Sequence, residues 1–334
     1  MEIVDLGATG LRSPQLGFGC ASLMGRTGRK DSLRALGAAW DEGIRFFDTA
    51  SSYGYGESEA LLGGFLRGRR HEAVIATKFG ILAAPQPAWK GAAKSVARTA
   101  FKLAPSLLRL LQKGAAQQFE HNQFTIPVLQ QSIEQSLTRL GVDCVDILFL
   151  HAAPASVLEQ HDLLDAMGRL VEAGKVRVAG LSGTPEVVEL AVRQATPPLK
   201  AMQFPCNVFD LSAATAFASS PSAHALVANH PFGGVARVEQ CRAVLQALAS
   251  DPELDADLRG RLGDDDGSVL ADVVLNSILS QTGIHVVIPA MTRVEHIRLN
   301  VRAVTQSRFT AGEIGKIRQA LKKSQGAGPA SAAA

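Results

Sequence analysis

The sequence predicts a single (β/α)8 barrel, and three observations carry this prediction. Eight short apolar segments recur, each followed by a polar or glycine-rich turn and then by helical periodicity. Most of them are continuously apolar, as in parallel strands that are covered on both faces. The turn after the first segment, GFGCASLMG, lacks the G-x-G-x-x-G spacing favoured by a doubly wound nucleotide-binding sheet. The expected strands are residues 16–20, 44–48, 73–78, 145–151, 176–182, 201–207, 224–230 and 285–290.

Helices are expected between these strands, and their end residues support the prediction. The helix at 127–141 opens with proline, which suits a first turn, and ends with glycine, which suits a helix terminus. The helix at 184–195 begins with Thr-Pro, which combines a capping hydroxyl with a first-turn proline. Two more are expected at 32–43, ending at Gly43, and at 163–175.

The two ends of the chain are predicted to lie outside the repeating strand–helix units. The first residues, EIVDLGATGLRSPQLG, resemble a hairpin with a glycine-containing turn, and we expect them to plug the barrel from below. Residues 324–334 are small and of low complexity, so a disordered tail is expected there. The predicted organisation is one domain over residues 1–323, followed by this tail.

Composition excludes several classes of protein. The chain has 334 residues, of which 46% are hydrophobic and 19% charged, enough for a large core. A net charge of +3 does not indicate nucleic-acid binding. The four cysteines are scattered, with no metal-binding spacing and no disulfide framework. No run of about 18 apolar residues occurs. A soluble cytoplasmic protein, monomeric or a small homo-oligomer, is therefore expected.

Four polar side chains are expected together at the carboxyl end of the barrel, where barrel enzymes place reactive groups. Asp48, Lys78 and His151 end the second, third and fourth strands, and Tyr53 follows Asp48 by five residues. An ammonium beside the tyrosine would stabilise its phenolate form, so the pKa of Tyr53 is expected to fall. Such a tyrosine can donate a proton, while a neutral imidazole holds a substrate oxygen.

Each of these residues also has an ordinary structural explanation. Asp48 is compatible with a turn cap, Lys78 with a solvated strand end, and His151 with a hydrogen-bonded core histidine. Their occurrence in order, at successive strand ends, favours a shared reaction site.

Three separated motifs resemble those of the aldo-keto reductases, NADPH-dependent (β/α)8 carbonyl reductases. They are DTASSYGYGESE, ATKFG and SLTRLGVDCVDILFLHAA, and the resemblance covers about residues 3 to 305. It implies that Tyr53 is the general acid and that Lys78 lowers its pKa. It also implies that Asp48 pairs with Lys78 and that His151 orients the carbonyl.

The same resemblance implies a nicotinamide site on the barrel mouth. The segment IPAMTRVEHIRLN at 288–300 resembles the family's adenosine-phosphate segment, in which Arg293 and His296 add charge and Asn300 contacts the adenine. Ser182 and Gln203 match positions that bind the nicotinamide carboxamide. The expected cofactor is NADPH or NADP+, with NADH as the alternative. The remaining implied cofactor-binding residues are Gly19, Cys20, Asp48, Pro231, Gly233, Ile288, Ala290, Met291 and Thr292.

The chain departs from the family pattern on this cofactor side. Gly183 follows Ser182 where the family often has asparagine, and Leu299 precedes Asn300 where it usually has glutamate. Asn229 stands where a tyrosine usually stacks on the nicotinamide, which leaves His230 or Phe232 as aromatic substitutes. These departures weaken the expectation of tight binding and of NADP preference.

A long insertion, predicted to be helical, separates the third and fourth strands over about residues 81–126. Residues 88–119 contain six Lys or Arg and no Asp or Glu, and a helical wheel separates a basic face from a leucine-rich one. One hypothesis is a lid that packs its leucines on the barrel rim. Such a lid would favour a bulky, fairly apolar carbonyl substrate, in a pocket lined by Trp89. The other is a docking surface for anionic lipid or a partner protein.

Three functions remain open from the sequence. The first is an NADPH-dependent carbonyl reductase. The second is a non-catalytic nicotinamide-binding regulator on the same fold, which the departures at Gly183 and Asn229 favour. The third is a Schiff-base aldolase that uses Lys78, which a charged partner such as Asp48 disfavours.

Overall fold

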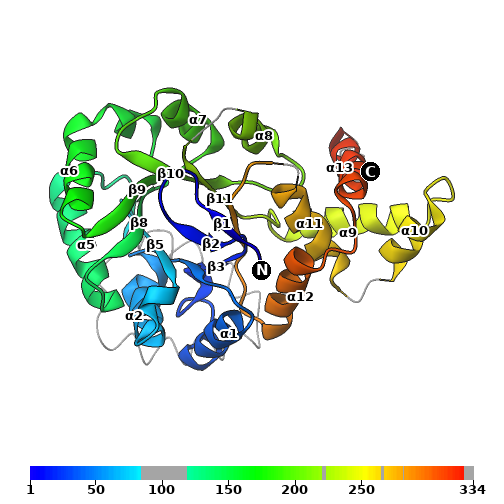
Figure 1. Cartoon of the computed structure of the whole chain (residues 1–334), viewed down its shortest axis with the longest axis horizontal. Helices are drawn as coiled ribbons and strands as arrows, with labels where there is room; N and C mark the ends of the chain where they lie inside the picture. The colour runs from blue at the N-terminus through cyan, green and yellow to red at the C-terminus, as the bar shows by residue number, and fades with distance from the viewer. Residues whose placement is uncertain (84–118, 220–222, 265–266, 281, 327–334) are drawn as a thin grey trace, which may run out of the picture.

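The protein is a closed (β/α)8 barrel (Figure 1). The computed structural model describes residues 1–83, 119–219, 223–264, 267–280 and 282–326. One eight-stranded parallel sheet has the strand order β12-β11-β10-β9-β8-β5-β4-β3. Parallel bridges from Leu16 to Val287 and from Gly19 to Ala290 join its first and last strands, so no edge is left open.

All eight expected strands are confirmed, within a few residues at each end. They are 3 to 7 residues long, and interior side chains and helices cover their two faces. The strands are β3 (Gly17–Gly19), β4 (Phe46–Asp48), β5 (Val74–Phe79), β8 (Val145–His151), β9 (Val176–Ser182), β10 (Leu199–Pro205), β11 (Ala225–Asn229) and β12 (Val286–Ile288).

Helices surround the barrel, and the four expected ones are present. The Thr125 hydroxyl caps α5 by accepting from the amide of Val128 at 3.4 Å, and Gly141 ends the helix at φ +66°. Three short helices, η1 (Cys20–Ser22), η3 (Arg70–Glu72) and η5 (Ala155–Glu159), lie in connections. The surrounding helices are α1 (Arg29–Asp41), α2 (Glu57–Leu66), α5 (Ile126–Leu140), α6 (His161–Glu172), α7 (Pro185–Arg193), α8 (Ser212–Ser219), α11 (Val269–Leu279) and α12 (Val294–Thr305).

Side chains alternate between two cores along each strand, as a period of two requires. In β8, Ile147 and Phe149 belong to the cluster inside the barrel, whereas Leu148 and Leu150 belong to the layer under the helices. Gly180 makes room inside, because a Cβ there would lie 2.6 Å from the Phe149 ring.

The N-terminal hairpin closes the lower end of the barrel, as predicted. Its strands β1 (Ile3–Asp5) and β2 (Arg12–Pro14) pair antiparallel, and their turn brings Leu6 and Leu11 into the interior cluster. Both leucines are almost fully buried. The hairpin therefore acts as a hydrophobic plug.

A lateral lobe extends from one side of the barrel, and it was not predicted from the sequence. It consists of α9 (Val235–Ala249), α10 (Ala256–Gly263) and α13 (Ala311–Gly326), which project away from the sheet (Figure 1). A separate hydrophobic cluster joins these helices to α11. The lobe is formed by the long connection between β11 and β12 and by the C-terminal helix.

The tail predicted from residue 324 overlaps the end of α13, which extends to Gly326. The Ser324 hydroxyl donates to the Leu321 carbonyl at 2.7 Å and accepts from the Gln240 amide at 3.3 Å. The hydrogen bond from Gln240 joins this part of α13 to α9. Residues 327–334 lie outside the described part of the chain.

The insertion after β5 starts and ends in paired backbone. Two short strands, β6 (Leu82–Ala83) and β7 (Phe119–Glu120), form an antiparallel ladder. In the predicted helical segment 88–119, residues 88–118, with Trp89 and the basic and leucine-rich faces, lie outside the described residues, whereas Phe119 belongs to β7.

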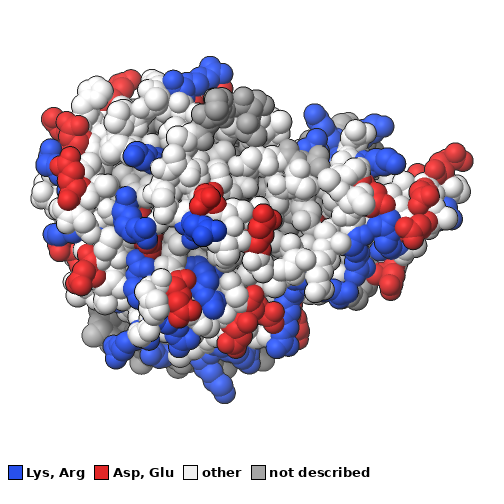
Figure 2. Space-filling view, in the orientation of Figure 1, with Lys and Arg blue, Asp and Glu red and all other residues white. Residues whose placement is uncertain are grey.

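The face of the molecule in Figure 2 carries Lys and Arg interspersed with Asp and Glu, the usual pattern of a solvated surface. Among the described residues, no helix combines the length and the apolar character needed to cross a membrane.

Candidate active site

Six polar residues face the interior at the carboxyl end of six neighbouring strands. Strand alternation explains this placement: in β8, for example, the inward side chains of Ile147 and Phe149 are followed by His151. The ends of all these strands meet at one mouth of the barrel. We call this set the polar ring; its members are Asp48, Lys78, His151, Ser182, Gln203 and Asn229.

Lys78 and Asp48 form a buried ion pair at the base of the polar ring. The ammonium nitrogen of Lys78 lies 2.7 Å from each carboxylate oxygen of Asp48 and donates to the Thr49 carbonyl at 2.8 Å. The two side chains are 2% and 8% exposed. Such a pair is tolerated inside a protein because every charge has several partners.

Tyr53 brings its hydroxyl to this ion pair. The phenolic oxygen lies 3.5 Å from the ammonium nitrogen of Lys78. The Tyr53 ring meets the His151 ring edge to face, with centroids 5.8 Å apart. The four residues predicted to react therefore lie together. Lys78 is not a solvated strand end, because it is buried and paired with Asp48.

A tight glycine-containing turn delivers Tyr53 to the site. Tyr53 opens the short helix η2 (Tyr53–Gly56), in which Gly54, Tyr55 and Gly56 all have positive φ. A Cβ on Gly54 would lie 3.0 Å from the Leu23 carbonyl oxygen, so this position also needs a small residue. The two glycines of the motif are explained by this backbone path.

The Ser-Glu pair that follows anchors the turn from beneath. The Ser58 hydroxyl donates to the Cys20 carbonyl at 3.2 Å, and the buried Glu59 carboxylate accepts from the Thr77 hydroxyl at 2.6 Å. Arg139 donates to the second Glu59 oxygen at 2.7 Å. Glu59 thus ties α2 to β5 and α5 and stabilises the segment that carries Tyr53.

The predicted fall in the pKa of Tyr53 is wrong for this structure. Burial raises the pKa of Tyr53, and the nearby Lys78 ammonium offsets this rise only in part. Burial lowers the pKa of Lys78, but the charges of Asp48 and Tyr53 and the hydrogen bonds to both together outweigh it, so the pKa is raised overall. The tyrosine is therefore protonated and the lysine charged at neutral pH.

His151 is neutral in this environment. Burial lowers its pKa to about 3, and the charges of Lys78 and His121 act in the same direction. A neutral imidazole carries one N–H donor and one acceptor nitrogen. Its Nδ1 atom is covered and has no hydrogen-bond partner within the described residues.

Two residues expected on the cofactor side belong to the same hydrogen-bond network. The Ser182 hydroxyl donates to the Gln203 amide oxygen at 2.7 Å, and the Gln203 amide nitrogen donates to Asp48 at 2.9 Å. Gln203 is fully buried. The network therefore runs from β9 through β10 to the ion pair on β4 and β5, a link that the sequence did not indicate.

The other expected cofactor residues lie around the mouth in two groups. Gly19 and Ala290 are bridged where β3 meets β12. Arg293 occupies the N-cap position of α12, and His296 is exposed in the first turn of that helix. Asn300, in the next turn, is buried. Pro231 and Gly233 belong to the connection from β11 to α9. Ile288, Met291 and Thr292 lie at or just beyond the end of β12.

Cys20 can offer only backbone atoms to a ligand at the mouth. Its side chain is fully buried within the outer hydrophobic core, and this burial raises the pKa of the thiol. The side chain of Met291 is also buried in that core. Both residues therefore position the chain near the mouth through packing.

The ladder of β6 and β7 contacts the turn that carries Tyr53 and was not predicted from the sequence. The Phe119 ring stacks on Tyr55, with centroids 5.4 Å apart. At the other end the Gln123 amide donates to the Gly80 carbonyl at 2.9 Å, and Phe124 packs on Phe79. Tyr55, two positions after Tyr53, was the available sequence signal for an aromatic contact at this turn.

Comparison with known proteins agrees with this architecture. The family model described as "Aldo/keto reductase family" matches residues 15–322, and the chain belongs to this family. It is 34% identical over 200 residues to a D-threo-aldose 1-dehydrogenase of Pseudomonas sp, covering 56% of each chain. It is 27% identical over 205 residues to "Aldo-keto reductase yakc [NADP(+)]" of Schizosaccharomyces pombe, covering 59% of this chain and 50% of the relative.

The matches to these two curated relatives thus span about half of their length. A solved structure, the aldo-keto reductase AKR11C1 from Bacillus halodurans in its holo form, is similar along 96% of both chains. Its TM-score is 0.69 at 20% sequence identity, a likeness that shows the shared fold.

Proposed function

We propose that the protein is an NADPH-dependent carbonyl reductase that converts an aldehyde or ketone into an alcohol, or catalyses the reverse oxidation. One observation carries the proposal: the buried Lys78 ammonium, held by Asp48, lies 3.5 Å from the hydroxyl of Tyr53 at the barrel mouth. Family membership and the relatives' names as reductases and dehydrogenases support this reaction class.

The chain's own residues divide the proton chemistry among them. Bound NADPH would supply a hydride to the carbonyl carbon. Tyr53 donates its proton to the carbonyl oxygen, and the Lys78 ammonium stabilises the phenolate that remains. Asp48 keeps Lys78 charged. The neutral imidazole of His151 orients the carbonyl oxygen, because its ring contacts Tyr53 and its Nδ1 atom has no other partner within the described residues.

The residues around the mouth fit a nicotinamide cofactor. Ser182 and Gln203 offer polar groups on neighbouring strands. The start of α12 offers backbone amides beside Arg293 and His296, both exposed, and such a helix start favours a phosphate. A charge-assisted phosphate contact is worth about 1.5–3 kcal/mol, which favours NADPH over NADH roughly ten- to a hundredfold. The NADP(+) in one relative's name supports the same choice.

The proposed substrate is a small-molecule carbonyl compound that is bulky and fairly apolar. The support is the stacked pair of Tyr55 and Phe119, which offers aromatic surface on the turn that carries Tyr53. A panel of aldehydes and ketones of increasing size, assayed by NADPH consumption, tests both the reaction and this preference.

Tyr53→Phe is the decisive variant, and Tyr55→Phe is its matched control on the same turn. Loss of the Tyr53 hydroxyl should lower the rate of reduction by about 10²–10⁴-fold, the usual contribution of a general acid. NADPH affinity should stay within about twofold, because the hydride donor does not need that hydroxyl. Tyr55→Phe keeps the aromatic stack and should keep the activity. Activity of Tyr53→Phe within tenfold of the wild type would remove Tyr53 from the role of acid.

The same assays separate the other two functions. NADPH binding without turnover of any carbonyl in the panel would favour the non-catalytic regulator. The aldolase is disfavoured because a charged Lys78 is a poor nucleophile. Borohydride trapping of a substrate on Lys78 would reverse that conclusion.

A further inference from the structure

Asn229 is the member of the polar ring that the proposed mechanism does not use. It ends β11, after Ala225 and Val227, which both face the barrel interior. Strand alternation therefore directs the Asn229 side chain into the mouth as well. In the closed strand order, β11 lies diametrically opposite β5, so Asn229 faces the mouth from the side away from Lys78.

The Asn229 amide has an unmet hydrogen-bonding requirement. Its Oδ1 atom is covered from solvent and has no partner among the residues that the structure describes. By contrast, Asp48, Lys78, Ser182 and Gln203 are all joined in one network. A covered amide oxygen without a donor is unfavourable, so such an atom is explained when a ligand supplies the donor.

The neighbouring aromatic residues do not take over this part of the wall. Phe232 is partly buried and packs against both the outer barrel core and the core of the lateral lobe. His230 is exposed, with φ at +53°, on the turn that leaves the mouth. The wall next to Gln203 is therefore polar at Asn229, and Gly183 adds no side chain on the other side.

We propose that Asn229 accepts a hydrogen bond from the carboxamide N–H of the nicotinamide and so replaces an aromatic contact with a polar one. The inference rests on the proposed function, because it requires a nicotinamide in the mouth. The Ser182 hydroxyl already donates to the Gln203 amide oxygen, and one of the two amide N–H groups of Gln203 already donates to Asp48. A carboxamide brings donors of its own, and among the described residues Asn229 is the ring member whose side-chain oxygen has no partner.

The test compares three ligands on the full-length protein by isothermal titration calorimetry. NADP+ carries the carboxamide, nicotinic acid adenine dinucleotide phosphate carries a carboxylate in its place, and 2′-phospho-ADP-ribose lacks the ring. Asn229→Leu, which removes the acceptor at similar volume, should weaken NADP+ binding roughly tenfold, the size of one hydrogen bond. Binding of the ring-free ligand should stay within about twofold, and the preference of the wild type for the carboxamide over the carboxylate should shrink.

Two further variants keep the result interpretable. Asn229→Ala repeats the test without the bulk of leucine. Ser277→Ala removes another buried polar atom that has no partner within the described residues, on α11 outside the polar ring, and should leave all three affinities unchanged. Both Asn229 variants should remain folded, because they remove an unsatisfied group.

The outcomes separate this inference from the proposed function. Unchanged NADP+ affinity in both Asn229 variants overturns the inference while the reductase proposal stands on its own turnover assay. Unchanged NADP+ affinity with a raised KM for the carbonyl compound also overturns it, because Asn229 then contacts the substrate. Absence of NADP+ binding by the wild type overturns both.

Discussion

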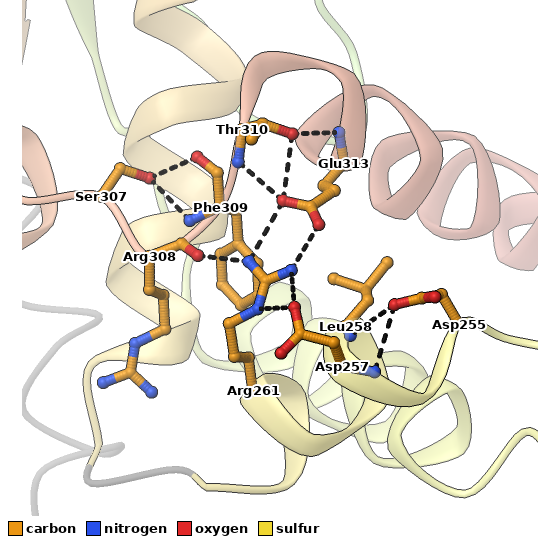
Figure 3. Close-up of polar contacts among 9 residues, drawn as sticks. All are labelled: Asp255, Asp257, Leu258, Arg261, Ser307, Arg308, Phe309, Thr310 and Glu313. Carbon is orange, nitrogen blue, oxygen red and sulfur yellow. Dashed lines mark hydrogen bonds and ion pairs between the residues drawn. The ribbon is translucent and has the colours of Figure 1, made fainter.

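The barrel mouth and the lateral lobe both place a cation against carboxylates, in opposite surroundings. Lys78 and Asp48 are 2% and 8% exposed and lie within the polar ring. Arg261 of α10 and Glu313 of α13 are 29% and 19% exposed and join two helices of the lobe (Figure 3). The first arrangement is costly to bury, whereas the second is partly solvated. The same kind of ion pair therefore lies within the proposed reaction site in one region and joins two helices in the other.

The network of the lobe is extensive in spite of its exposure. Arg261 donates to both Glu313 oxygens, to Asp257 at 3.1 Å and to the Arg308 carbonyl at 2.5 Å (Figure 3). Glu313 also accepts from the Thr310 amide at 2.8 Å, and the Thr310 hydroxyl accepts from the Glu313 amide at 3.3 Å. This reciprocal pair is a capping box at the start of α13. One arginine thus fastens α10 to a capped helix start.

The largest expected effect is on the buried pair. Lys78→Met should destabilise the protein by about 3–5 kcal/mol, because Asp48 is left charged and buried, with the Gln203 amide as its one remaining side-chain partner among the described residues. The double variant Asp48→Leu/Lys78→Met should recover more than half of that loss, yet neither variant should reduce carbonyl compounds. Urea unfolding and NADPH consumption measure the two effects. If Lys78→Met lowered the free energy of unfolding by less than about 1 kcal/mol, Asp48 would not be left as an uncompensated buried charge.

A smaller loss of stability is expected in the lobe, with activity retained. Arg261→Ala should lower the free energy of unfolding by about 1–3 kcal/mol, since several charge-assisted hydrogen bonds are lost at a partly exposed site. The rate of reduction should stay within twofold, because the lobe contributes no member of the polar ring. Arg34→Ala, which breaks the exposed pair with Asp31 on α1, is the control and should change stability by less than about 0.5 kcal/mol. If Arg261→Ala and Arg34→Ala lowered the free energy of unfolding equally, the Arg261 network would stabilise the protein no more than an exposed ion pair does.

The contrast between the regions also explains what the sequence could predict. The eight strands and the residues Asp48, Tyr53, Lys78 and His151 were predicted because they follow local patterns: apolar runs, turns and strand ends. The hydrogen bond from Gln203 to Asp48 joins residues 155 positions apart, and no local pattern encodes it. The pKa of Tyr53 was predicted in the wrong direction because the sequence does not reveal how deeply the phenol is buried.

The lobe was missed for a related reason. The helices α9 and α10 lie in one long connection, and their apolar residues face a cluster that includes α11 and α13. Such a cluster is defined by tertiary packing, so it does not appear as a repeated strand–helix unit. Arg261 in particular gives no sequence signal, because its partner Glu313 is 52 residues away.

The smallest expected effect is a pH dependence that is confined to the lobe. Arg261 and the Thr310 amide hold the pKa of Glu313 at about 2, below its usual 4.5. A carboxylate whose pKa is lowered on folding stabilises the native state above pH 4.5, and this contribution is lost as the pH falls toward 2. Glu313→Gln should therefore unfold at a lower urea concentration than the wild type at pH 7, and the difference should narrow between pH 5 and pH 3. Glu134→Gln, which changes an exposed pair with Lys175, should show almost no difference at either pH. A Glu313 difference that is constant from pH 7 to pH 3 would show that the capping hydrogen bonds, which glutamine partly keeps, matter more than the charge.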